Sequence, residues 1–250
     1  MIEIRDYEDE ILDLIARYRA ASGPGMQLLN LLGGSVDDLI QQLPVAVQDR
    51  LTGATEKALN IALGVATESR RAVPDQAGWL NSAVATTMGA VGGFGGISSS
   101  LIELPVTTTI LLRAIQGVAV DQGFEVESEA VRFDCIRVIG SAGPLARDDG
   151  ANLGFLSARI TLTGATMQRV IATVAPRFAA ALGHKLAAQT VPVLGALAGA
   201  ATNYVYTSYY QEMAYIHFRL RRLALEMDQS YHEILADLTQ RITKSTHTHD

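Results

Sequence analysis

Apolar side chains recur every three or four residues along most of this chain, the spacing that gathers them on one face of an α-helix. The first such helix starts near Asp6, whose carboxylate can cap it, and the glycines of 23–25 end it. Its predicted buried stripe consists of Ile4, Tyr7, Ile11, Leu14 or Ile15, and Tyr18.

Two further helices follow from the same spacing. One starts at Pro44, which suits a first helical turn, and ends near Arg71. Its predicted apolar face consists of Val47, Leu51, Ala54, Ala58, Ile61 and Val65. Pro105 can open the next helix and Gly123 can close it. The apolar positions of that helix are Val106, Ile110, Ala114 or Ile115, and Val118.

The rest of the chain also has a helical pattern, and β-type alternation is short and local. Helices are predicted over about 126–141, over 155–188, and as one long amphipathic helix over 212–242. Glycine, proline and charge at 140–154 indicate a loop between two helical halves of a single domain, residues 1–250. Residues 243–250 are expected to fray. The predicted fold is an all-α bundle of about seven to ten helices.

Two long stretches, 76–102 and 186–211, contain no charged residue. Each would span about 40 Å as a helix, which exceeds the roughly 30 Å of a bilayer's hydrocarbon core. Both contain glycines four residues apart, a spacing that lets helix backbones approach closely. We therefore expect tightly packed central helices rich in glycine and alanine. The glycines are Gly89, Gly92, Gly93 and Gly96 in the first stretch and Gly195 and Gly199 in the second.

The glycine cluster does not fit a phosphate-binding loop. No strand precedes it, Ser98 stands where a dinucleotide-binding motif needs its third glycine, and no lysine is near in sequence. A net charge of −6 with scattered basic residues argues against nucleic-acid binding. The single cysteine, Cys135, excludes an internal disulfide and suits a reducing compartment. The five histidines lack metal-ligand spacing, so no metal or cofactor is expected.

One acidic residue stands alone in apolar sequence. Glu103 must be exposed, paired or protonated there. It is either a helix-end group at the edge of the apolar region or part of a buried polar cluster that positions helices or binds a small ligand. The residues considered for this cluster are Glu103, Arg113, Asn203, Glu212 and Arg219.

A run of aromatic residues follows the second uncharged stretch and has two interpretations. Tyrosines at helical spacing are typical of a half-buried core, and they are also enriched at membrane–water interfaces. The sequence leaves both open for Tyr204, Tyr206, Tyr209, Tyr210, Tyr215 and Phe218.

Three segments together resemble the EcsC family of bacterial proteins: "DRLTGATEKALNIAL", "WLNSAVATTMGAVGGFGGISSSLIELPVTTTILLRAIQGVAVDQGFE" and "VPVLGALAGAATNYVYTSYYQEMAYIHFRLRRL". Their most specific feature is the glycine-rich run, then Leu104-Pro105, a helix and Gly123-Phe124. The family takes its name from a protein encoded beside an ABC transporter, and the resemblance implies no catalytic residues. Many members carry an aspartate near the Leu-Pro pair, where this chain has Glu103 before it and threonines after it.

Three functions remain as hypotheses. The first is a non-enzymatic accessory protein, cytoplasmic and peripherally or reversibly bound at the inner membrane, with a membrane surface or a membrane protein complex as partner and a link to transport. The second is a soluble helical module that binds a lipid or another apolar ligand. The third is an enzyme with a polar site near Glu103 and Asn203. The sequence does not specify an oligomeric state.

Overall fold

The computed structural model describes residues 4–21, 23–24, 43–72, 97–141, 143–144, 166–189 and 195–246. Within these ranges the chain forms seven α-helices and no strand, which confirms the predicted all-α bundle. The helices are α1 (Ile4–Ala21), α4 (Val45–Ala72), α6 (Ile97–Asp121), α7 (Glu129–Ile139), α9 (Met167–Gln189), α10 (Gly195–Met227) and α11 (Tyr231–Thr246).

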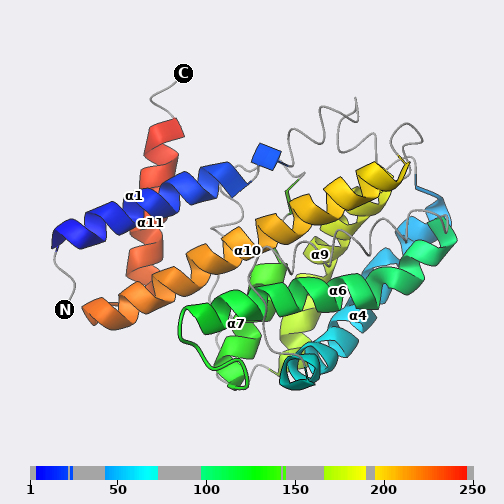
Figure 1. Cartoon of the computed structure of the whole chain (residues 1–250), viewed down its shortest axis with the longest axis horizontal. Helices are drawn as coiled ribbons and strands as arrows, with labels where there is room; N and C mark the ends of the chain where they lie inside the picture. The colour runs from blue at the N-terminus through cyan, green and yellow to red at the C-terminus, as the bar shows by residue number, and fades with distance from the viewer. Residues whose placement is uncertain are drawn as a thin grey trace.

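The longest helix, α10, organises the bundle (Figure 1). It packs against α6, α7 and α9 along one part of its length, while α1 and α11 pack against it and against each other. Helices α4 and α6 form the most extensive interface among the described helices, and α9 also packs against α4. The terminal helices α1 and α11 are therefore joined to the rest mainly through α10.

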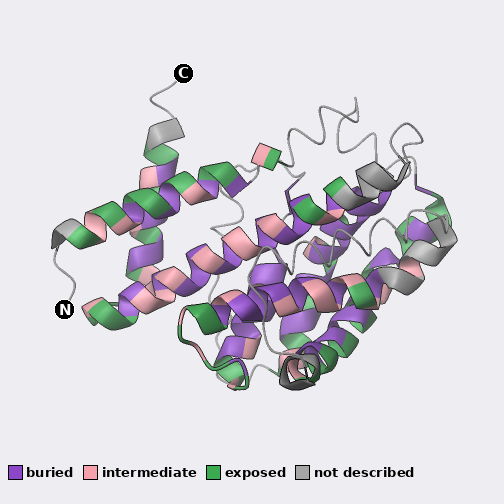
Figure 2. Ribbon diagram, in the orientation of Figure 1, coloured by how far each residue is buried: buried purple, intermediate pink, exposed green. Residues whose placement is uncertain are grey.

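Most of the aromatic run on α10 belongs to the protein core, although Tyr204 is 51% exposed. Much of the middle of α10 is buried (Figure 2). Tyr206, Tyr209 and Tyr210 are fully buried. The Tyr206 hydroxyl donates to the Ala181 carbonyl at 2.9 Å, and the Tyr210 ring meets Phe178 edge-on at 6.0 Å. Burial raises the pKa of both phenols well above its usual value. The core interpretation is thus correct for these three residues.

The buried face of α1 agrees with its predicted stripe. Ile11, Leu14, Ile15 and Tyr18 are all buried, and Tyr7 packs at the edge of the core. The helix starts before Asp6, however, so this carboxylate lies in the first turn rather than at the cap. Its negative charge still interacts favourably with the helix dipole there. The Ile4 side chain lies outside the described residues.

The apolar face predicted for α4 is only partly correct. Ile61 and Val65 are 41% and 47% exposed. The residues that replace them in the core are Thr55, Leu59, Ala62, Leu63 and Ala66. The predicted stripe follows a seven-residue repeat, which drifts about 20° per heptad around a straight helix. The drift carries the later predicted positions away from α6 and α9.

The exposed side of α4 includes a glycine whose replacement is expected to stabilise the protein. A Cβ at Gly64 would meet no atom within 4 Å. Since alanine loses less backbone freedom in a helix, Gly64→Ala should raise the free energy of unfolding by about 0.5–1 kcal/mol. Urea unfolding of the wild type and the variant measures the change. A loss of stability would show that this stretch of α4 is not helical in solution.

Helix α6 starts eight residues before the predicted position. Pro105 lies inside the helix rather than at its start, and the Thr109 hydroxyl bonds back to its carbonyl at 2.7 Å. Val106 is consequently 45% exposed, while Leu104 and Thr108 face the core. The preference of proline for a first helical turn therefore indicated the wrong start for this helix.

The C-terminus of α6 is the one predicted. Gly123 has φ +79°, its amide donates to the Val120 carbonyl at 2.8 Å, and the Phe124 amide donates to the Ala119 carbonyl at 2.9 Å. These two bonds form a Schellman motif, which needs a left-handed residue at this position.

The single long helix predicted over 212–242 is wrong, because the chain breaks between α10 and α11. Asp228 adopts φ +54°, and the Gln229 amide closes α10 by donating to the Ala224 carbonyl. Ser230 then caps α11: its hydroxyl accepts from the His232 amide, and its own amide donates to Glu233, both at 3.3 Å. Ser230 and Glu233 form a capping box, a signal that is readable in the sequence.

Several predictions fall partly or wholly outside the described residues. Gly89, Gly92, Gly93 and Gly96 lie outside them, and so does most of the 140–154 loop, of which Gly140 caps α7. Gly195 and Gly199 lie in the first turns of α10, whose surroundings the structure does not describe. Residues 243–246, the start of the expected frayed tail, are helical.

A close helix–helix approach occurs at a glycine that the sequence analysis did not single out. Gly183 of α9 lies so near α4 that a Cβ would be 3.0 Å from the Leu51 side chain. In the second uncharged stretch, Thr202, Val205 and Thr207 are buried within the protein. Across the described helices, none combines the length and the hydropathy that a membrane crossing requires.

Candidate functional site

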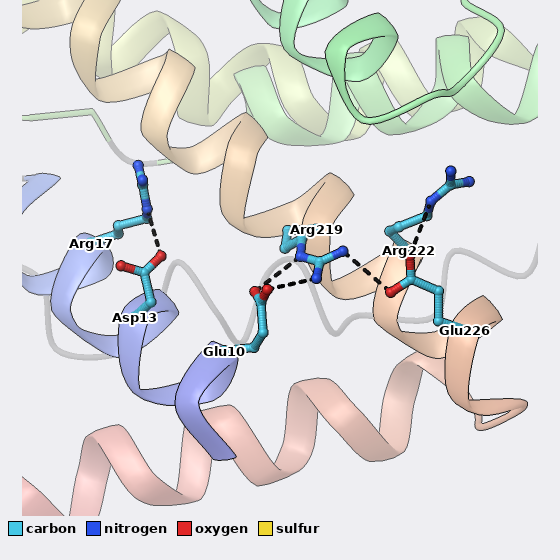
Figure 3. Close-up of polar contacts among 6 residues, drawn as sticks. All are labelled: Glu10, Asp13, Arg17, Arg219, Arg222 and Glu226. Atoms are coloured by element: carbon cyan, nitrogen blue, oxygen red, sulfur yellow. Dashed lines mark hydrogen bonds and ion pairs between the residues drawn. The ribbon is translucent and has the colours of Figure 1, made fainter. Parts of the chain in front are cut away.

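Two of the predicted polar residues lie in a row of ion pairs between α1 and α10, which we call the α1–α10 seam. Arg219 of α10 grips Glu10 of α1 with two bonds, at 3.0 Å from Nε and 2.7 Å from Nη2. Its third nitrogen, Nη1, lies 3.3 Å from Glu226 (Figure 3). Planar, two-point pairing of this kind holds arginine in a defined orientation.

The seam continues two turns along α10. Arg17 of α1 bonds to Asp13 at 2.8 Å and to Glu212 of α10 at 3.1 Å. Its guanidinium also lies 4.2 Å from the centre of the Tyr215 ring. Because residue 10 pairs with residue 219 and residue 17 with residue 212, the two helices run antiparallel with matched charges.

A second set of polar contacts joins α1 to α11. The Tyr7 hydroxyl donates to Asp237 at 2.9 Å, and Arg241 bonds to Glu8 with its Nη2 at 2.9 Å. Burial and the Asp237 bond raise the pKa of Tyr7 to about 12, and the bond from Arg241 lowers the pKa of Glu8. These groups therefore keep the protonation states that the pairs require at neutral pH.

The seam has the properties of a structural joint. Its side chains are partly exposed, and each carboxylate is matched by an arginine. The Glu10 bond raises the pKa of Arg219, which stabilises the charged form further. Exposed or part-exposed pairs each contribute up to about 1 kcal/mol. Together the pairs define the register of α1 on α10.

The predicted polar cluster does not meet at one point on α10. Glu212 and Arg219 are seven residues apart on one face and pair with α1 rather than with each other. Asn203 lies about 13 Å before Glu212 along the helix and on the opposite side, given 3.6 residues per turn. Arg113 is half-buried on α6. Glu103 also lies on α6, but its side chain is outside the described residues.

A buried charged cluster, which the sequence analysis missed, joins α7, α10 and α11. Asp134 of α7 bonds to Arg221 of α10 and lies 3.8 Å from Arg137. His217 of α10, which is 1% exposed, places Nε2 3.3 Å from Asp134 Oδ1, without the alignment of a good hydrogen bond. Its Nδ1 lies 2.9 Å from the hydroxyl of Tyr231, the first residue of α11.

Three basic side chains around Asp134 determine its charge. Burial by itself would raise the pKa of this carboxyl, but His217, Arg221 and Arg137 outweigh burial, and the pKa is lowered from 3.8. Burial raises the pKa of Tyr231 far above its usual value of 10.0. Tyr231 thus keeps its proton and acts as a hydrogen-bond donor, unlike an activated nucleophile.

A sequence signal for this cluster did exist. Asp134 stands between Phe133 and Cys135, and His217 stands between Ile216 and Phe218, all of them buried. A charged residue at a core-facing helical position requires a partner. Applied to Asp134 as it was to Glu103, this argument would have indicated a buried pair. Nothing in the sequence indicated which helices would meet there.

Metal binding receives no support from the described part of the chain. In the residues that the structure describes, no group of three or more histidine, cysteine or acidic side chains is placed to hold a metal ion.

Among the described residues, two exposed apolar side chains lie close together on α4 and form what we call the α4 patch: Ile61, Gly64 and Val65. The two side chains are one turn apart on the exposed side of α4, and Gly64 between them adds no polar group. In sequence the patch precedes Arg70-Arg71 and the uncharged stretch 76–102.

The fold and its polar groups define an all-α bundle in which ion pairs join α1 to α10 and α11, and α7 to α10. The chain belongs to the EcsC protein family, whose model matches residues 25–223. Helices α1 and α11, together with the α1 half of the seam, lie outside the matched range. Comparison with curated proteins and with solved structures finds no match.

Proposed function

We propose that the protein is a non-enzymatic accessory protein that binds peripherally and reversibly at the cytoplasmic face of the inner membrane, in support of transport. The α4 patch is the proposed contact. The observation that carries the proposal is the exposure of Ile61 and Val65 on the side of α4 that faces away from α6 and α9.

The charged residues on the patch side of α4 balance one another. Lys57 precedes Ile61 by four residues and Glu68 follows Val65 by three, so both share the face of the patch, and their opposite charges leave the binding to the apolar pair. The apolar pair would add burial at the headgroup boundary, where each methylene contributes about 0.8 kcal/mol. Binding of this size is reversible, as an accessory protein requires.

The polar groups support a role in binding rather than in catalysis. The carboxylates of the α1–α10 seam are engaged by arginines, and Asp134 is surrounded by cations. A catalytic base or nucleophile needs a pKa shifted toward neutrality. The pKa shifts of Asp134 and Tyr231 move away from neutrality: the pKa of Asp134 is lowered, so it stays charged, and the pKa of Tyr231 is raised, so it stays neutral.

Flotation with lipid vesicles tests the proposal. The wild type should float with vesicles of phosphatidylethanolamine and phosphatidylglycerol, and the double variant Ile61→Asp/Val65→Asp should lose at least about five-sixths of that binding because it places charge in the interface. Leu225→Asp is the matched control, since Leu225 is 67% exposed on α10, far along the chain from the patch. Circular dichroism checks that each variant is folded.

Two outcomes would contradict the proposal: a wild type that stays at the bottom of the gradient, or equal losses in the control and the double variant. The alternative function, a soluble module for a lipid or another apolar ligand, predicts a bound molecule instead. Organic extraction of the purified protein followed by mass spectrometry would reveal it.

A further inference from the structure

The exposed face of α4 carries a charge pattern that is complementary to itself. Its residues Lys57, Ile61, Gly64 and Glu68 follow one another at intervals of four, three and four positions, so they share one side of the helix. All four are exposed. A positive charge therefore stands at one end of the α4 patch and a negative charge at the other, with the apolar residues between them.

Two copies of this face match when their α4 helices run antiparallel. Ile61 and Gly64 lie equally far from the midpoint between Lys57 and Glu68. A two-fold axis through that midpoint places Lys57 opposite the partner's Glu68, and Ile61 opposite the partner's Gly64. A parallel arrangement would set lysine against lysine and glutamate against glutamate. The charges thus favour the antiparallel arrangement.

The middle of the face has room for a side chain from the second copy. A Cβ at Gly64 would meet no atom of its own chain within 4 Å. The side chain of the partner's Ile61 can therefore rest on the helix backbone at Gly64, which lets the two helices approach closely. Val65 flanks this contact. The pairing removes Ile61 and Val65 of both copies from water, which favours association.

The charged ends favour the same pairing. Opposite charges across an interface attract, and the two-fold symmetry supplies the Lys57–Glu68 pair twice. A carboxylate has two oxygens that accept several bonds, so Glu68 can bind the partner's Lys57 without giving up a contact in its own chain. Arg50 lies two turns before Lys57. Its counterpart position falls after Ala72, the last residue of α4, so the partner's α4 presents no charge against it.

We propose that two copies of the chain associate through the α4 patch, antiparallel about a two-fold axis, with Lys57 of each copy paired with the partner's Glu68. Each copy contributes one helix face, so the interface is small and the dimer is weak and reversible. The dimer covers Ile61 and Val65 and so withholds them from a bilayer. This last consequence rests on the proposed function, whereas the dimer itself does not.

Charge reversal tests the pairing on the full chain, by sedimentation equilibrium without lipid over about 10–500 μM. The wild type should form a concentration-dependent dimer. Lys57→Glu and Glu68→Lys each place like charges opposite one another twice, so each variant should dimerise at least about tenfold more weakly. An equimolar mixture of the two variants restores both opposite-charge pairs. It should associate within about threefold of the wild type, as should the double variant Lys57→Glu/Glu68→Lys.

A wild type that stays monomeric at every concentration, or a mixture that associates no better than its separate components, would overturn the proposal. Flotation judges the proposed function independently, because a monomer can still bind vesicles. Circular dichroism checks that each variant is folded.

If Glu68→Lys does not fold, a cysteine variant decides. Oxidation of Gly64→Cys should link two copies, because this position lies beside the two-fold axis. Asp49→Cys is the matched control: it is exposed on α4 about 20 Å from the axis, so it should stay unlinked. The native Cys135 is buried and leaves the introduced thiol to react. Equal linking of the two variants would contradict the predicted register.

Discussion

Replacing Asp134 with asparagine is expected to lower the free energy of unfolding by about 3–5 kcal/mol, the cost of breaking a buried ion pair from one side. Asparagine keeps the shape of the side chain but removes its charge. Arg221 and Arg137 would then lose the carboxylate with which both pair, and His217 would lose its acidic neighbour. Chemical denaturation at neutral pH measures the loss.

The loss should depend on pH in a defined direction. Because the folded protein lowers the pKa of Asp134 from 3.8, its contribution is fully present above that value and disappears as the pH falls through the lower folded pKa. The difference between wild type and variant should therefore be constant from about pH 5 to pH 7 and shrink in strong acid.

Asp237→Asn is the matched control for this prediction. Asp237 also pairs with an arginine, Arg241, but both side chains are 32% exposed, so its replacement should cost at most about 1 kcal/mol. Similar losses for the two variants would mean that water reaches the cluster around Asp134. A loss at Asp134 that persists unchanged in strong acid would contradict the charge argument.

Gly143→Ala is expected to be the other severe substitution, with a loss of about 2–4 kcal/mol. Gly143 has φ +90°, a conformation that L-residues rarely adopt. A Cβ there would also lie 2.9 Å from the Ala181 Cβ on α9, closer than two carbon atoms can pack. Both effects act in the folded state. Urea denaturation measures their sum.

A double-mutant cycle separates the two effects. Ala181→Gly removes the atom that the new methyl group would strike, so combining it with Gly143→Ala should recover the crowding part of the loss. The backbone part, about 1–2 kcal/mol, should remain. Simple additivity of the two single variants would contradict the predicted contact between the segment after α7 and helix α9.

The helices differ in how much of their structure depends on residues close by in the sequence. The α1 stripe and the Gly123 terminus were predicted correctly because they depend on neighbours within two turns. The α4 face was assigned too far around the helix, since α6 and α9 decide which side is covered. The break before α11 was missed. Ser230 and Glu233 form a capping box that indicates it, but the helical spacing of apolar residues continues past this point and favoured one long helix.

The candidate sites were less predictable than the helices. The sequence analysis chose Glu212 and Arg219, and the structure places them in the α1–α10 seam with partners about two hundred residues away in the chain. It did not choose Asp134 or His217, which are buried side by side and joined only through the packing of α7 on α10. Pairing between distant segments leaves no periodic signal in a single sequence.

By itself, the sequence determined the helical class, the family resemblance, the low charge and the buried stripe of α1. These follow from spacing and composition, which act over one or two helical turns. Only the tertiary structure decided which face of α4 is exposed, which charges meet in the seam, and that one histidine joins α7 to α11. Those outcomes depend on which helices pack together, and packing selects contacts by burial and shape rather than by distance along the chain.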